Sequence, residues 1–558
     1  MNKPSAFLTW LDDHPQSYFW LVAAVIAASA TLALLSWWRA KPADRPQPDW
    51  KWGLVLLAIL AAGRWPSMII PRELNTDESN FFASAHALTH DPVFWRSVDG
   101  YTSGPLNFFC LIPAGWLAGW DSFLAIRICA LLALAACLTL VHQCLALVYP
   151  PRTVRLATFS AAVLEALTNS VDLQHFSSEL LSLVWLSVAA YAALRRWVYR
   201  GGPLWSGLGG LMLGAVPMSK LQPAPLAFCA GLYWLWAEFR HRGPETLRHR
   251  NYLMIGAVLP TLLFVLPVLI AGQWDNFVNS FLRFNLGYAA AGDTSPVRWL
   301  EGMLAKSREQ DSLLHLWLPG MILWCALAFR AHAIGDRIAR RFTFLALTAT
   351  VLATFCVVRA GRPFLHYWQL VIPALTLLLG ALLGNLAAAP AGAAKSDRGL
   401  MAAAALALVL TLGGHRLVKP SFFVGAFTYF EAHPRNPISD HILAHARPGD
   451  AIAIWGWSNY IYVETGLRQS TQDAEIERSV RPGPLQQFFR ERFLADLMVT
   501  RPALFVDSVG PCSIYFQAPA LKHDRNFPEL GAVIRADYVL VDEVDGAQIY
   551  RRRDRVAR

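Results

Sequence analysis

The chain has 558 residues, of which 55% are hydrophobic and only 16% are charged. Soluble proteins of this size carry about a quarter charged residues, so the composition excludes an ordinary soluble protein and indicates a membrane protein. The formal charge of +10 does not indicate a nucleic-acid partner, because the basic residues fall in short loops between apolar runs, where a membrane explains them.

Apolar runs of about 20 residues, long enough to cross the hydrocarbon core, recur along the chain. We predict about twelve spans, at residues 18–38, 52–70, 122–148, 154–171, 177–195, 203–219, 221–238, 252–271, 313–330, 342–358, 364–387 and 399–415. The run 104–120 is also apolar, but Pro105 and Pro113 interrupt it. We therefore expect it to lie in or dip into the membrane interface.

Basic residues are distributed unequally between alternate loops. The richer loops lie near residues 39–51, 152–155, 195–200, 240–250, 330–341 and 395–398. Because cytoplasmic loops carry the excess of Lys and Arg, these loops are predicted to be cytoplasmic. The opposite loops, the N-terminal tail with Asp12 and Asp13, and everything after about residue 414 are then predicted to face the outside.

Two adjacent carboxylates, Asp77 and Glu78, follow the span 52–70 in the first outer loop. Charged groups close to hydrocarbon are costly, so an acidic pair here favours a functional site. The alternative is that Thr76 or Asp77 caps a helix beginning at Glu78, where acids interact well with the helix dipole. The two interpretations are compatible. Residues 81–88 are predicted to form an amphipathic helix on the membrane surface.

Further polar and aromatic side chains gather on the same side, at the ends of other spans: His175, Glu179, Lys220, Arg362, His366 and Tyr367. Each has a structural alternative. Lys220 and Arg362 could extend to the lipid interface, Glu179 could cap a helix, and the aromatic residues could belong to an interfacial belt. Their concentration on one face favours a site there, because a transporter would place its charges and broken helices near the midplane.

After residue 418 the composition becomes mixed and charged. Strand-like runs occur at 451–457, 503–507 and 538–542, and the hairpin signal Asp545-Gly546 leads into residues 548–550. A helix is predicted at about 483–499. We therefore divide the chain into a tail with an accessory span (1–50), a transmembrane catalytic domain (51–418) and an outer α/β domain (419–558). That last domain has a single cysteine, Cys512, so it holds no internal disulfide.

The order and sidedness of these motifs resemble the protein O-mannosyltransferase superfamily, which includes the bacterial aminoarabinose transferases and has the GT-C fold. The resemblance covers roughly residues 50–390 and rests on the acid pair, the helix behind it, Ser178-Glu179, Ser219-Lys220 and residues 361–367. It implies an α-helical polytopic membrane protein of GT-C type in the bacterial inner membrane, with a C-terminal extracytoplasmic α/β domain. The extra N-terminal span departs from the simplest pattern of that superfamily.

The resemblance also implies an enzyme that moves a sugar from a polyprenyl-phosphate donor to a lipid, glycan or protein acceptor outside the cytoplasm, with inversion. Asp77 would act as the base and Glu78 would orient the acceptor or the base. Lys220 and Arg362 would bind the donor phosphate. The remaining pocket residues would be His175, Glu179, His366 and Tyr367. No cofactor is implied with certainty, and dependence on a divalent metal stays open, although no metal site is indicated. The alternatives are a lipid-linked glycan polymerase or ligase, and a transporter or flippase without enzyme activity.

Overall fold

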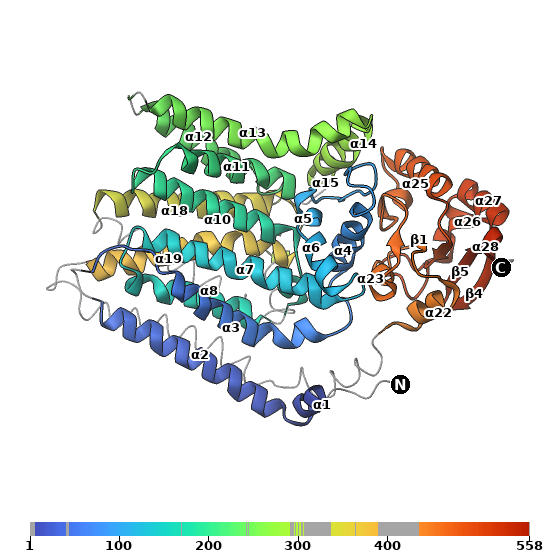
Figure 1. Cartoon of the computed structure of the whole chain (residues 1–558), viewed down its shortest axis with the longest axis horizontal. Coiled ribbons are helices and arrows are strands. Elements are labelled where there is room, and N and C mark those ends of the chain that lie inside the picture. The colour runs from blue at the N-terminus through green and yellow to red at the C-terminus, as the bar shows by residue number, and fades with distance from the viewer. Residues whose placement is uncertain are drawn as a thin grey trace.

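The computed structural model describes residues 6–40, 44–168, 170–240, 245–290, 336–362, 364–388 and 435–556, and residues 243, 295, 297, 298, 301, 302 and 305. A bundle of long helices forms one part of the molecule and a small α/β domain forms the other (Figure 1). The predicted spans 313–330 and 399–415, and the predicted domain boundary at 418, lie outside the described residues.

The other predicted spans are helices. Their bounds are α2 Pro15–Trp38, α3 Trp50–Ile69, α7 Phe123–Ala146, α8 Pro151–Leu167, α10 Ser178–Trp197, α11 Pro203–Ser219, α12 Ala224–Arg240, α13 Thr246–Ile270, α18 Arg337–Arg359 and α19 Val371–Ala388. Within the described residues, seven helices are long and apolar enough to cross a membrane, and α8, α11 and α12 are shorter, at 17 residues each. The chain is thus a multi-pass membrane protein, and the number of twelve spans stays a prediction.

The bundle orders its loops as the charge pattern predicts. The connections from α2 to α3, from α7 to α8 and from α10 to α11 lie at the end away from the C-terminal domain (Figure 1). These are basic-rich loops. The short helix α1 (Ala6–Asp13) lies toward the opposite end, and the helix that carries Asp77 lies there beside the domain. The two sets of loops therefore occupy opposite ends of the bundle, and the compartment that each end faces stays a prediction.

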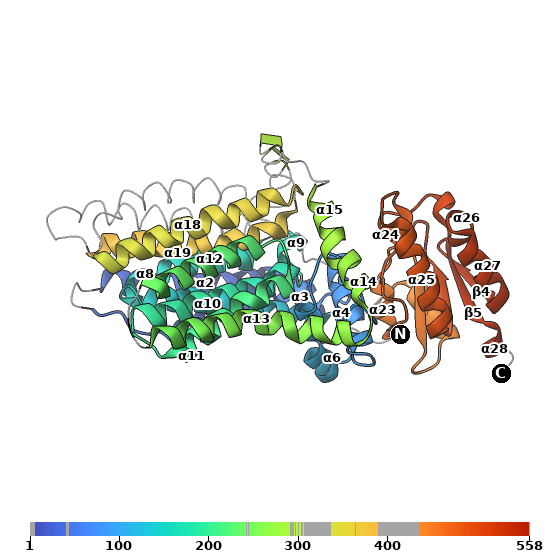
Figure 2. The same ribbon diagram turned by 90° about the horizontal axis from the view of Figure 1, so that it is seen from above.

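The run 104–120 is not a span but two short helices, α5 (Leu106–Phe109) and α6 (Ile112–Ala118), as its prolines predict. The expectation for residues 81–88 was wrong. Helix α4 (Thr76–Leu88) does not lie on a surface but between the bundle and the C-terminal domain (Figures 1 and 2). Small and apolar residues occur on all sides of this helix rather than on one face. The elements α5, β2 and α23 pack against it, so most of its side chains are buried.

The C-terminal domain contains a five-stranded sheet in the order β2-β1-β3-β5-β4. The strands are β1 Ala451–Trp455, β2 Arg468–Gln469, β3 Leu504–Asp507, β4 Tyr538–Val544 and β5 Ala547–Arg552. The strand β1 runs parallel to β2 and β3, whereas β5 runs antiparallel to β3 and β4. The predicted hairpin turn joins β4 to β5, and Asp545 and Gly546 both have positive φ, as a type I′ turn requires. The two-residue strand β2 was not predicted.

Helices flank this sheet. They are α22 Pro437–His445, α23 Tyr460–Thr465, α24 Glu477–Val480, α25 Gln486–Thr500, η5 Pro519–Leu521, α26 His523–Asn526, α27 Pro528–Asp537 and α28 Arg553–Val556. The predicted helix 483–499 corresponds to α25. The remaining short helices of the bundle side are α9 (Val171–Gln174), α14 (Trp274–Phe277), the π-helix η1 (Val278–Arg283), α15 (Phe284–Ala290) and η3 (Leu365–Leu370). Of these, η1 contacts the C-terminal domain through Ser280 and Arg492, and α15 contacts it through Phe284 and Phe489.

A buried ion-pair network joins the C-terminal domain to the first outer loop. The Asp99 carboxylate lies 3.0 Å from the Arg478 guanidinium and 2.8 Å from that of Arg492. Asp473 accepts from Arg492 at 2.7 Å, and Arg492 also donates to Ser280 of η1 at 2.7 Å. Buried charges are tolerated only when they are paired, so the network fixes three separate segments in one arrangement.

Candidate active site

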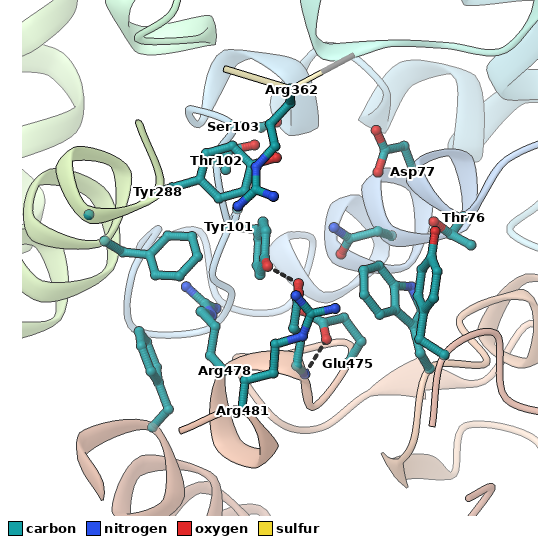
Figure 3. A pocket seen from close by; sticks show the side chains of 18 of the residues that line it. Thr76, Asp77, Tyr101, Thr102, Ser103, Tyr288, Arg362, Glu475, Arg478 and Arg481 are labelled. Carbon is teal, nitrogen blue, oxygen red and sulfur yellow. Dashed lines mark hydrogen bonds and ion pairs between the residues drawn. The ribbon is translucent and has the colours of Figure 1, made fainter. Parts of the chain in front are cut away.

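A cavity of about 730 Å³ lies between the bundle and the C-terminal domain. We call its two sides the bundle wall and the domain wall. The bundle wall carries the polar residues Asn75, Asp77, Tyr101, Asp172, Lys220, Arg283, Tyr288, Arg362, His366 and Tyr367. The domain wall carries Trp457, Asn459, Glu475, Glu477, Arg478, Arg481 and Tyr515. Figure 3 shows Asp77 and Arg362 on one side of this space and Arg478 and Arg481 on the other.

Asp77 is held at the cavity by the start of α4. The helix is capped by Asn75, whose side-chain oxygen accepts from the Asp77 backbone N–H at 3.0 Å. The Asn75 amide also donates to Asp172 at 3.0 Å, which fixes the cap against α9. The interpretation that Thr76 or Asp77 caps the helix was therefore wrong. Within the described residues, the Asp77 carboxylate makes no hydrogen bond or ion pair and lines the cavity. It is left available for a ligand.

The Glu78 carboxylate lies away from the cavity. It is fully buried and accepts two hydrogen bonds from the Arg127 guanidinium, from Nε at 2.9 Å and from Nη2 at 3.0 Å. One oxygen also accepts from the Leu74 backbone N–H at 2.9 Å. Arg127 in turn donates to the carbonyl of Ser67 at 2.9 Å and to that of Ile70. Glu78 does not line the cavity, so it cannot orient an acceptor there. It holds the end of α3 against the start of α4.

Lys220 reaches the cavity from the C-terminal end of α11. A backbone bridge to Ser103 holds it in place. Its ammonium lies 2.5 Å from Glu179 and 2.5 Å from the Ser178 hydroxyl, and it stands 4.9 Å from the centre of the Tyr367 ring. The side chain is nearly buried, so the alternative that Lys220 extends to the lipid interface was wrong. An ammonium has three N–H donors, and Glu179 and Ser178 accept two, which leaves one for a ligand.

Arg362 and His366 come from the segment that opens the last described helix of the bundle. The Arg362 guanidinium stacks 4.9 Å from the centre of the Tyr288 ring and forms no ion pair with an acid in the described part of the chain. His366 lies 4.0 Å from Asp172. His175 is fully buried and does not line the cavity; its ring contacts that of His366, with centroids 5.7 Å apart. His175 therefore supports His366 rather than a ligand.

The domain wall was missed at the sequence level. The Tyr101 hydroxyl donates to Glu477, and Arg481 pairs with the same carboxylate at 2.8 Å. Burial raises the pKa of Glu475 to about 7, and the neighbouring Arg478 opposes that rise. A dense run of charges at 475–481, followed by Pro-Gly-Pro, was the available signal. Nothing in that run alone shows that it faces a membrane domain far away in the sequence.

The architecture is shared with a known membrane glycosyltransferase. ArnT from Cupriavidus metallidurans bound to undecaprenyl phosphate aligns over 89% of this chain and 97% of its own, with 14% identity and a TM-score of 0.54. Its apo state gives the same values. An oligosaccharyltransferase from Archaeoglobus fulgidus, tethered with an acceptor peptide, covers 82% of this chain and 69% of its own, with 12% identity and a TM-score of 0.38.

No family model and no curated protein matches this chain. The similarity to ArnT is one of fold, because 14% identity carries no more than that. It confirms the predicted fold class, a helical membrane protein of GT-C type with a small sheet near its C-terminus.

Proposed function

We propose that the protein is a membrane glycosyltransferase that moves a sugar from a polyprenyl-phosphate donor to an acceptor bound in the cavity. The observation that carries this proposal is the bundle wall. It places an unpaired carboxylate, Asp77, in the same cavity as two cationic side chains, Lys220 and Arg362. The shared fold with ArnT, which has been solved with undecaprenyl phosphate, supports a lipid-linked donor.

The chemistry of the transfer follows from these three groups. Asp77 accepts the proton of an acceptor hydroxyl or amine as that atom attacks the anomeric carbon. The new bond forms on the face opposite the bond to the phosphate oxygen, which breaks, so the configuration inverts. Polyprenyl phosphate leaves with the electron pair. Lys220 and Arg362 stabilise the charge on its oxygens, and such charge-assisted contacts are the strong ones.

The other predicted residues take supporting roles in this proposal. Glu179 pairs with Lys220 and sets the direction of its ammonium. His366 and Tyr367 line the space beside it, and His175 holds His366. Glu78 is a positioning residue, because it acts on Asp77 only through Arg127 and the turn that begins α4. We place the cavity outside the cytoplasm of a bacterial inner membrane, on the asymmetry of the basic loops.

The position of the cavity favours an enzyme over a transporter. It lies at the end of the bundle, under the C-terminal domain, and not at the middle of the helices where transporters bind their substrates (Figure 1). A polymerase or ligase of lipid-linked glycans would use the same bundle wall with a lipid diphosphate leaving group.

The test is release of the lipid phosphate. The purified protein is reconstituted with a panel of undecaprenyl-phosphate and undecaprenyl-diphosphate sugars and a membrane extract as the acceptor source. Free undecaprenyl phosphate should appear with the monophosphate donors and should depend on Asp77. Release of diphosphate alone would identify the polymerase or ligase instead. Movement of an intact lipid-linked sugar across the bilayer without release would identify a flippase and overturn the proposal.

The sidedness has its own test. Glu543 is exposed on β4 of the C-terminal domain. In a Cys512→Ser background, Glu543→Cys should react with a membrane-impermeant maleimide added to intact spheroplasts. Labelling only after permeabilisation would place the cavity in the cytoplasm.

A further inference from the structure

The C-terminal sheet presents a crevice to the cavity. Its strand order turns back between β1 and β3, since β2 lies on one side of β1 and β3 on the other. In open sheets of this kind, ligands bind outside the carboxyl ends of the strands at such a reversal. Trp457 and Asn459 directly follow β1, and Tyr515 lies on the loop after β3. All three line the cavity, so the crevice opens toward the bundle wall.

Asn459 is the strongest indication of a ligand. Its side chain is fully buried, and neither its amide nitrogen nor its oxygen has a hydrogen-bond partner among the described residues. The residue precedes α23, but its side chain does not cap that helix. A buried amide without partners lowers the folding stability, because its hydrogen bonds to water are lost and not replaced. An amide in a cavity wall offers one acceptor and two N–H donors, which match neighbouring hydroxyl groups.

Trp457 is held as a rigid aromatic surface. Its backbone N–H donates to the Ser513 hydroxyl at 3.0 Å, and its carbonyl accepts from Ile514 at 3.1 Å. The indole ring contacts the Tyr515 ring, with centroids 5.1 Å apart, and stacks on Phe516 at 6.2 Å. The indole N–H is buried and has no partner in the described part of the chain. The apolar ring faces can pack against the C–H groups of a saturated polar ring. The unsatisfied polar groups can form hydrogen bonds with the hydroxyl groups at its edge.

We propose that Trp457, Asn459 and Tyr515 form a subsite for an uncharged sugar ring of the acceptor, which is therefore a glycan or a glycolipid. We call these three residues the aromatic subsite. The assignment to the acceptor rests on the proposed function, because the donor phosphate belongs to the bundle wall, where Lys220 and Arg362 lie. The ring is uncharged because all three side chains are neutral.

Sugar binding by the purified protein tests the subsite without the transfer reaction. Saturation-transfer NMR is recorded on the full chain in nanodiscs with methyl glycosides of glucose, galactose, mannose and N-acetylglucosamine. At least one should receive saturation. Trp457→Ala should reduce its affinity about tenfold or more, since an aromatic contact and its buried area are lost. Trp116→Ala is the matched control, because Trp116 is exposed on α6 and does not line the cavity.

Asn459→Ala separates binding from structure. It removes an amide without partners, so thermal stability should be unchanged or higher while sugar affinity falls. Loss of stability with unchanged sugar affinity would show that Asn459 is structural and would overturn the subsite. So would the absence of saturation for all four glycosides with the native protein.

The subsite can fail while the proposed function holds. Trp457→Ala should still bind undecaprenyl phosphate with native affinity, measured by native mass spectrometry. Asp77-dependent release of undecaprenyl phosphate to a peptide or to a lipid without sugar would overturn the subsite and leave the glycosyltransferase standing. A loss of undecaprenyl phosphate binding in Trp457→Ala would also contradict the subsite, because it would place these residues on the donor.

Discussion

The two walls of the cavity use different chemistry. The bundle wall presents charges at the ends of helices: Asp77 at the start of α4, Lys220 at the end of α11 and Arg362 before η3. The domain wall presents aromatic rings and a neutral amide beside Glu477, Arg478 and Arg481, whose charges are already paired. Charges that can reach a ligand therefore concentrate on the wall nearest the membrane. This contrast indicates that one wall suits a lipid phosphate and the other a neutral polar ring.

The largest effect is expected on the bundle wall. Asp77→Asn keeps the shape of the side chain, and α4 keeps its cap because Asn75 supplies it. The variant removes the basicity, so transfer should fall by about 10²–10⁴-fold with donor affinity unchanged. Asp121→Asn, an exposed acid in the same loop, is the control and should keep full rate. Near-full turnover in Asp77→Asn would show that Asp77 is not the catalytic base. The charges of the bundle wall would then have no demonstrated role in catalysis.

The next prediction concerns the ion-pair network that holds the two walls together. Asp99→Asn leaves Arg478 and Arg492 with Asp473 as their nearest buried acid, and breaking such a buried network costs about 3–5 kcal/mol. The C-terminal domain should then release α4. Hydrogen exchange of the α4 amides should speed up, and transfer should fall in parallel.

The control for that release is Arg481→Ala. Arg481 is exposed and pairs with Glu477 at the rim of the cavity, outside the network. Its substitution should leave the exchange of α4 unchanged. If Asp99→Asn also leaves that exchange unchanged, the network does not hold the two walls together.

A smaller effect is expected for donor binding. Arg362→Ala should weaken the affinity for undecaprenyl phosphate about ten- to hundredfold, since a charge-assisted contact is worth about 1.5–3 kcal/mol. Arg359→Ala, an exposed arginine one turn earlier, should not. Lys220 needs a paired change because its loss would leave Glu179 buried and unpaired. The double variant Lys220→Met with Glu179→Gln should therefore fold and show a loss similar to that of Arg362→Ala. Native donor affinity in both variants would assign the phosphate to another part of the cavity.

The sequence allowed the helices of the bundle to be predicted because long apolar runs have one stable arrangement in a membrane. It also pointed to the acid pair, but not to the roles of its two members. Neighbouring residues on a helix point about 100° apart, so Asp77 can face the cavity while Glu78 points away from it. Which of the two faces the cavity depends on where Arg127 lies, on a helix some 50 positions later, at 2.9 Å from Glu78.

The domain wall could not be predicted for a related reason. The burial of α4 and the position of the run 475–481 both come from docking the C-terminal domain through Asp99, and that contact joins residues far apart in the chain. The strand β2, two residues long, has no alternation to recognise. Asn459 gave no signal, because an asparagine before a helix is ordinarily a cap, and only the structure shows that its amide has no such role.

The smallest effect concerns the pH range in which the turn beneath Asp77 is stable. Burial raises the pKa of Glu73 to about 7, and the nearby Glu78 carboxylate adds to that rise. The Ser79 hydroxyl donates to Glu73 at 2.5 Å. The folded chain therefore keeps this proton to about pH 7, whereas the unfolded chain releases it near 4.5. This stabilisation is fully present below the unfolded pKa and is lost as the pH rises through 7.

The native protein should accordingly unfold at a lower temperature at pH 8 than at pH 5.5. Glu73→Gln, which is neutral throughout, should reduce that difference by a few degrees. Differential scanning fluorimetry in detergent measures it, with Glu491→Gln, an exposed acid on α25, as the control. An unchanged pH dependence in Glu73→Gln would mean that the Glu73 carboxyl has the same pKa in the folded chain as in the unfolded chain. The turn that carries Asp77 would then need no protonated acid for its stability, and the bundle wall would keep its shape across the whole pH range.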